Sequence, residues 1–207
     1  MTRVEFFAQW SQAHGGVALN VIVRGWLNIS YSIARVLSAL RLTPNSITVA
    51  GVLAAIALVP TARTWAAPII LIFSLICDGV DGSLAIITGK STIRGAAWDS
   101  IADRISEALW AVAFYRIGAP IEVIFFAWLA AATQEYLRAR TAGLGYKQID
   151  FVTVAERPVR AIIMCVALLA YLLELKSVTG LAVVWLVLQS FSFVALARHT
   201  YKKITTS

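Results

Sequence analysis

Charged residues are scarce in this chain. Only 14% of its 207 residues are charged and 59% are hydrophobic, whereas a soluble domain carries about 25% charged residues. Together with a mean hydropathy of +0.78, this deficit excludes an ordinary soluble domain and indicates a membrane protein. The net charge of +7 therefore predicts contact with anionic membrane lipids rather than with nucleic acid.

Cysteine is nearly absent as well. Cys77 and Cys165 each lie inside an apolar segment and match no disulfide or metal-binding spacing. Residues 1–16 lack a continuous apolar core, so we expect no cleavable signal peptide. Without internal repeats or low-complexity tracts, the chain is predicted to have a juxtamembrane helical segment over 1–42 and one six-span domain over 43–207.

Six apolar segments approach the roughly 17 to 25 residues that a membrane span requires. The predicted spans are 46–62, 65–88, 95–117, 120–137, 158–175 and 178–197. Before the first of them, Thr43 is placed to cap a helix and Pro44 to occupy its first turn. The predicted fold class is an all-α membrane protein with six transmembrane helices and an N-terminal interfacial amphipathic helix.

The basic residues predict the orientation. Arg63, Arg116 and Lys176 would lie on one side of the membrane and Arg104 inside a span, while every other lysine and arginine would lie on the opposite side. Because the basic side of a membrane protein is normally cytoplasmic, we expect a multi-pass protein of the plasma membrane with both termini in the cytoplasm.

Residues 17–42 are apolar but interrupted by polar side chains. At helical spacing an apolar stripe lies beside a polar one, which is typical of a helix in the membrane interface. A re-entrant or tightly packed helix is the alternative. The stripe consists of Val21, Trp26, Ile29, Ile33, Val36 and Leu40.

Four aspartates lie within the second and third predicted spans: Asp78, Asp81, Asp99 and Asp103. An aspartate at the bilayer centre costs about 2.5 to 3.5 kcal/mol on insertion scales, so four of them require compensation. Each pair is three or four residues apart and shares a helix face, so a hairpin would bring all four carboxylates together. Carboxylates that converge in this way favour a hard divalent cation between them.

Small residues accompany the acids. These small residues would let the helices pack closely; they are Gly79, Gly82, Ser83, Ala85 and Gly89 on one predicted helix and Gly95, Ala96 and Ala97 on the other. The same residues would let the backbone approach a bulky polar ligand such as a nucleotide. Both interpretations remain open from spacing alone.

The sequence from Asp78 to Asp103 resembles the signature of the CDP-alcohol phosphotransferases. That signature reads D-x-x-D-G-x-x-A-R, then eight residues, then G-x-x-x-D-x-x-x-D, and every Asp, Gly and Ala position matches here. The exception is the signature's arginine, which is Ile86. The resemblance extends to an interfacial N-terminal helix, six spans and a Leu-Thr-Pro-Asn entry to the first span.

The resemblance implies a phospholipid synthase that moves a phosphatidyl group from CDP-diacylglycerol to the hydroxyl of a polar acceptor and releases CMP. It implies Mg²⁺ or Mn²⁺ as cofactor, a site toward the cytoplasm, and a homodimer. The implied metal ligands are Asp78, Asp81, Asp99 and Asp103, with Asp103 also the catalytic base. The implied nucleotide-binding residues are Asp78, Gly82, Ala85, Gly95 and Asp99.

A second resemblance concerns the acceptor. The segments 135–140 and 156–160 are similar to segments of actinobacterial phosphatidylinositol-phosphate synthases, in which basic residues hold the phosphate of inositol phosphate. The acceptor-phosphate residues implied are Arg138, Arg157 and Arg160, with an acceptor that is a small phosphorylated polyol. The alternative is that these arginines set the topology and contact lipid headgroups.

Several functions remain open. The active transferase is favoured, with glycerol phosphate as the alternative acceptor, which would make the protein a phosphatidylglycerophosphate synthase. A degenerate relative would bind metal or CDP-lipid without turnover, because Ile86 lacks the signature's charge; on the active view Lys90 or Arg94 supplies that charge. An ion channel or carrier is disfavoured because the acids follow a spaced enzyme signature.

Overall fold

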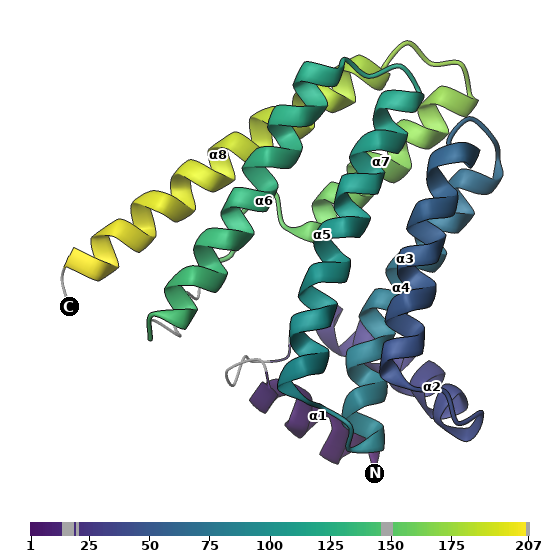
Figure 1. The fold of residues 1–207 in the computed structure, drawn as a ribbon, viewed down its shortest axis with the longest axis vertical. Coiled ribbons are helices and arrows are strands. Elements are labelled where there is room, and N and C mark those ends of the chain that lie inside the picture. Colours follow the sequence, from purple (N-terminus) through teal and green to yellow (C-terminus); the bar gives the residue numbers. More distant parts are fainter. Residues whose placement is uncertain (14–18, 20, 146–150, 206–207) are drawn as a thin grey trace. The chain divides into compact units, whose positions relative to one another are not determined.

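The computed structural model describes residues 1–13, 19, 21–145 and 151–205, and within these ranges all regular structure is helical. The described residues form eight helices and no strand, which confirms the predicted all-α class (Figure 1). In chain order they are α1 (Arg3–Ala13), α2 (Val21–Ala39), α3 (Pro44–Thr61), α4 (Ala66–Thr88), α5 (Ile93–Arg116), α6 (Ile121–Gly143), α7 (Arg157–Leu172) and α8 (Val178–Thr205).

Three helices in the described part of the chain are long and apolar enough to cross a membrane: α3, α4 and α8. They coincide with the first, second and sixth predicted spans. Helices α5 and α6 carry more charged side chains than such a span tolerates, and α7 has only 16 residues. The remaining three spans stay a prediction from the sequence.

Two compact units make up the chain. Unit 1 comprises Met1–Ile56 and Ile70–Ser106, and unit 2 comprises Ala57–Ile69 and Glu107–Ser207. In unit 1, α4 packs against α3 through a buried hydrogen bond from Ser74 Oγ to the Gly51 carbonyl, 2.8 Å long. On another side α4 meets α2, where Ser83 Oγ donates to Ser30 Oγ at 3.1 Å.

Local capping signals fix the helix ends next to the aspartates. Thr43 and Ser46 cap α3 reciprocally, with Ser46 N donating to Thr43 Oγ1 at 3.2 Å, so the predicted cap is confirmed. Gly89 ends α4 in the left-handed conformation with φ of +64°. Thr92 Oγ1 then accepts from Gly95 N at 3.0 Å at the start of α5. The short connection makes α4 and α5 a hairpin, as the four aspartates require.

The N-terminal region differs from the single helix predicted over 17–42. Helix α2 begins at Val21, and a separate helix, α1, precedes it. Within α2 and just after it, the predicted apolar stripe is mostly exposed, whereas the buried side chains are Leu27, Ser30, Tyr31 and Ala34. An exposed apolar stripe is what an interfacial helix needs, but its place in the membrane stays a prediction.

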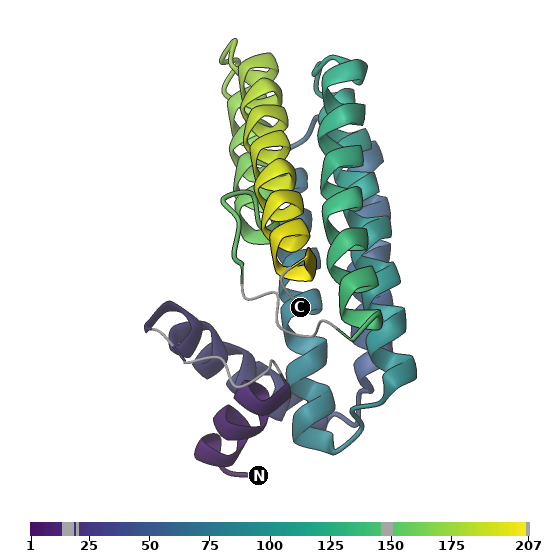
Figure 2. The ribbon, with the colours of Figure 1, turned by 90° about the vertical axis from the view of Figure 1, so that its left-hand side faces the viewer.

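Unit 2 is built around α8, which packs along α6 and also contacts α7 (Figure 2). A chain of buried hydrogen bonds joins Gln189 Nε2 to Gln134 Oε1 at 3.0 Å, and Gln134 Nε2 to Thr153 Oγ1 at 3.2 Å. Ser192 Oγ accepts from Ala155 N at 2.9 Å. These bonds hold the segment just before α7 against the helices.

Two helices extend beyond their predicted spans. Helix α6 continues to Gly143 rather than ending at 137, and α8 continues to Thr205 rather than ending at 197. The predicted spans end where charged residues begin, but a helix can continue through these residues because Arg and Lys are good helix formers. The length of an apolar run therefore predicts the membrane-spanning part of a helix but underestimates the length of the whole helix.

The predicted topology is testable by cysteine labelling in intact cells, after replacing Cys77 and Cys165 with alanine. We expect a membrane-impermeant maleimide to label Ser177→Cys from outside, because the few basic residues lie on that side, and to label Ala142→Cys only after permeabilisation. Both positions are exposed, so access through the protein itself is not limiting. The reverse labelling pattern would contradict the topology.

Candidate active site

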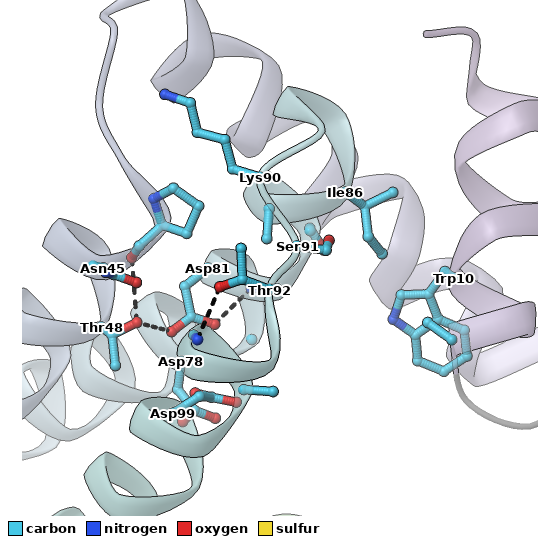
Figure 3. Close-up of a pocket in the computed structure, with 18 of the residues that line it drawn as sticks. Trp10, Asn45, Thr48, Asp78, Asp81, Ile86, Lys90, Ser91, Thr92 and Asp99 are labelled. Atoms are coloured by element: carbon cyan, nitrogen blue, oxygen red, sulfur yellow. Dashed lines mark hydrogen bonds between the residues drawn. The ribbon is translucent and has the colours of Figure 1, made fainter.

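A pocket of about 390 Å³ lies in unit 1. Helices α1 to α4, the α4–α5 connection and the first turns of α5 all contribute to its wall. Figure 3 shows Asp78, Asp81 and Asp99 gathered on one side, with Ile86 farther along α4, Lys90 just beyond the end of α4 and Trp10 on α1. The pocket therefore has an acidic end and an aromatic end.

Three of the predicted metal ligands converge: Asp78 and Asp99, which line the acidic end, and Asp103, which is not among the lining residues. Carboxylate oxygens of Asp78, Asp99 and Asp103 lie within 4.8 Å of one another, and all three residues are half-buried. Asp103 also lies 4.0 Å from the guanidinium of Arg104, measured from Oδ2 to NH2. Helices α4 and α5 thus bring together acids that are up to 25 positions apart in the sequence.

Asp81 is held differently. Its side chain is buried, with Oδ2 accepting from Thr48 Oγ1 at 2.5 Å and Oδ1 accepting from Gly82 N at 2.6 Å. It lines the pocket with Asp78 and Asp99 but is not part of the cluster of three formed by described residues. Sequence reasoning missed Thr48, because no spacing rule links a hydroxyl on α3 to an acid on α4.

The residues predicted to bind the nucleotide all lie in this pocket. Asp78, Gly82, Ala85, Gly95 and Asp99 contribute to its wall. A Cβ added at Gly82 would meet no atom within 4 Å, so close packing does not explain this glycine. Of the two cations expected to replace the signature's arginine, Lys90 lines the pocket and Arg94 is not among its lining residues.

The arginines predicted to hold the acceptor lie in unit 2, and carboxylates orient them. Arg138 donates to both oxygens of Glu156, with NH1 at 2.7 Å from Oε2. Burial alone would raise the pKa of Glu156, but the hydrogen bonds from Arg138 and Thr153 outweigh it and lower this pKa to about 2. The hydrogen bond to Glu156 in turn raises the pKa of Arg138, so both side chains keep their charges at neutral pH.

Arg160 is more deeply buried than Arg138. It donates from NH2 to Glu107 Oε1 at 2.6 Å and from NH1 to the Ala155 carbonyl at 2.7 Å. Its side chain is only 1% exposed. Arg157 lies nearby, with its guanidinium 5.4 Å from the ring centre of Trp110. Glu107 and Glu156 were not singled out in the sequence, although Glu107 follows Asp103 by one helical turn.

The donor set at the acidic end fits a divalent cation. Three carboxylates at this separation repel one another in a low-dielectric setting unless a positive charge lies between them. All the candidate ligand atoms are hard oxygens, which suit Mg²⁺ or Mn²⁺ and suit zinc or copper poorly. The residues that would hold the cation are Asp78, Asp99 and Asp103, with Asp81 beside them.

Comparisons with known proteins give the chain's relatives. The model of the family described as CDP-alcohol phosphatidyltransferase matches residues 33–195. The chain is 29% identical over 177 residues to the archaetidylinositol phosphate synthase of Aeropyrum pernix, which covers 81% of this chain and 90% of the relative. It is 31% identical over 148 residues to the phosphatidylinositol phosphate synthase of Mycobacterium tuberculosis, which covers 66% of this chain and 67% of the relative.

Solved structures have a similar fold. The phosphatidylinositol phosphate synthase of Mycobacterium tuberculosis with CDP-DAG bound aligns with a TM-score of 0.62 at 24% identity, over 82% of this chain and 94% of that chain. A structure of the same synthase with manganese and citrate aligns with a TM-score of 0.62 at 23% identity, over 81% and 88% of the two chains. At this level of identity the likeness shows the fold.

The acidic cluster makes a prediction about metal affinity. We expect Asp78→Asn and Asp99→Asn each to weaken Mn²⁺ binding at least about tenfold, because asparagine keeps the shape of the side chain but loses the charge. Mn²⁺ binding is measured by electron paramagnetic resonance on purified protein. Glu174→Gln, which removes an exposed carboxylate of unit 2, is the control and should bind Mn²⁺ as the wild type does. Wild-type affinity in both aspartate variants would exclude this site.

Proposed function

The chain belongs to the CDP-alcohol phosphatidyltransferase family, and we propose that it transfers the phosphatidyl group of CDP-diacylglycerol to a hydroxyl of inositol phosphate and releases CMP. The observation that carries this proposal is the convergence of the carboxylates of Asp78, Asp99 and Asp103, of which Asp78 and Asp99 line a pocket of about 390 Å³ together with Asp81. The family membership supplies the reaction class.

The residues of the pocket suit this chemistry. A divalent cation, when bound, supplies positive charge to the pyrophosphate and to the leaving CMP. Asp78, Asp81 and Asp99 would hold that cation on the pyrophosphate, and Gly82, Ala85 and Gly95, which line the same pocket, would contact the nucleotide. Asp103 takes the proton of the acceptor hydroxyl. The hydroxyl oxygen then attacks the phosphatidyl phosphorus, and the bond from this phosphorus to CMP breaks.

The acceptor is inferred from the relatives and from the arginines. The names of the synthases from Aeropyrum pernix and Mycobacterium tuberculosis share inositol phosphate and differ in the lipid part. Arg138, Arg157 and Arg160 are then the residues that hold the acceptor's phosphate, since guanidinium groups bind phosphate at well-defined angles. The carboxylates of Glu156 and Glu107 fix the arginines before the acceptor arrives.

The membrane setting completes the proposal. We infer six spans, an interfacial α2, both termini in the cytoplasm and a site that opens toward the cytoplasm of the plasma membrane. The segment 1–42 serves as the juxtamembrane part and 43–207 as the catalytic domain, and the family resemblance favours a homodimer. There are two alternatives. The acceptor could instead be glycerol phosphate, or the chain could be a degenerate relative without turnover, an alternative that is raised because Ile86 replaces the signature's arginine.

The acceptor assignment is tested by CMP release from purified protein with CDP-diacylglycerol and Mg²⁺. Among inositol phosphate, glycerol phosphate, inositol and serine, we expect inositol phosphate to give the highest kcat/KM. Arg138→Ala should raise the KM for inositol phosphate about 10- to 100-fold through loss of a charge-assisted hydrogen bond, with the KM for CDP-diacylglycerol unchanged. Preference for glycerol phosphate would overturn the acceptor, and no CMP release with any acceptor would establish the degenerate alternative.

Lys90 is expected to supply the charge that Ile86 lacks. Lys90→Ala should raise the KM for CDP-diacylglycerol about tenfold, because a cation beside the pocket favours the pyrophosphate. Arg94→Ala is the matched control: it removes a neighbouring cation that does not line the pocket and should change this KM little. Equal effects of the two substitutions would show that only the general positive charge of this region matters.

A further inference from the structure

Ile86 does not simply leave a gap where the family signature has arginine. Its side chain packs against a buried cluster formed by Phe6 of α1 with Leu27 and Tyr31 of α2. An arginine in this place would lose the apolar packing on the cluster, and its guanidinium would have to turn toward the pocket that Ile86 also lines. The signature's cationic position therefore packs against the cluster that joins α1 and α2.

Several contacts hold α1 on α2. The rings of Phe6 and Tyr31 lie 5.3 Å apart, and the Tyr31 hydroxyl donates to the Met1 carbonyl at 3.0 Å. The guanidinium of Arg3 lies 5.3 Å from the centre of the Tyr31 ring. Trp10, one of the apolar side chains packed against the same cluster, lines the pocket. The packing of Ile86 and the position of Trp10 are thus two results of one arrangement.

A second indole reaches the pocket from α2. A Cβ added at Gly79 would lie 2.4 Å from Cζ2 of Trp26, a distance that no side chain tolerates. Gly79 occupies a variable position of the signature, so the family pattern does not account for it, whereas the close approach of Trp26 to α4 does. Trp26 also lines the pocket. Two tryptophans that the signature does not include, Trp10 and Trp26, therefore line the pocket.

The division of the pocket suits the two parts of a CDP-linked lipid. The pyrophosphate belongs at the acidic end, where the aspartates would hold a cation. The nucleotide base then lies elsewhere in the pocket and needs a flat, apolar surface. Indole rings are such surfaces, and stacking of a base on an aromatic side chain strengthens binding about 5- to 150-fold. We propose that Trp10, which packs against the same cluster as Ile86 and lines the pocket, is the residue on which the base of the CDP-linked lipid stacks, so that α1 is part of the substrate site.

This inference rests on the proposed function and names a further substrate-contacting residue for it. Its test is the affinity of the purified full-length protein for CMP in the presence of Mn²⁺, measured by isothermal titration calorimetry. We expect Trp10→Ala to weaken CMP binding about 5- to 150-fold and Trp10→Phe, which keeps an aromatic face, to retain most of the affinity. The affinity for Mn²⁺ alone should stay that of the wild type, because the carboxylates are untouched.

Two further variants separate stacking from other roles. Trp65→Ala removes an exposed tryptophan of unit 2 and should leave CMP binding unchanged. Ile86→Arg should weaken CMP binding through loss of the α1 contact, and it should add little to Trp10→Ala because both act on the same contact.

The failures are distinguishable. Wild-type CMP affinity in Trp10→Ala would overturn the stacking role and leave the transferase function intact. A loss in Trp10→Phe as large as in Trp10→Ala, or tighter CMP binding in Ile86→Arg, would also overturn the inference. Absence of CMP binding by the wild type would overturn the proposed function and this inference together.

Discussion

The cost of placing carboxylates inside an apolar helix hairpin governs this structure. Helix α4 is among the most apolar in the chain, yet it carries Asp78 and Asp81 and faces Asp99 and Asp103 on α5. Their mutual repulsion and their desolvation must be offset locally. Thr48 and the Gly82 amide satisfy Asp81 within the protein, whereas the other three acids converge in the way that a bound cation requires.

The need to offset these charges also explains features of residues other than the four aspartates. Thr43, Gly89 and Thr92 fix the helix ends so that α3, α4 and α5 meet at the pocket. In unit 2 carboxylates neutralise two arginines: Glu107 pairs with Arg160, and Glu156 pairs with Arg138. Buried charges of both signs are thus paired or clustered, which is the condition under which an apolar bundle retains them.

Much of this was accessible from the sequence, for identifiable reasons. Composition and apolar runs predicted an all-helical membrane protein, and the spacing of the aspartates predicted a hairpin that brings acids together. Helix α1, Thr48, Glu107 and the tryptophans at the pocket escaped prediction, because each acts through a contact between elements that no local pattern records. Ile86 is instructive: the sequence marks it as a missing charge, and only the packing of α1 shows what the isoleucine contacts instead.

The most direct measurement is the position of Mn²⁺ in crystals of the protein grown with Mn²⁺ and CMP, located by anomalous scattering at the manganese edge. We expect a peak about 2.0 to 2.6 Å from carboxylate oxygens of Asp78, Asp99 and Asp103, with the CMP phosphate beside it. Manganese bound elsewhere, or CMP bound away from these three aspartates, would contradict a metal-dependent transferase site in the α4–α5 hairpin.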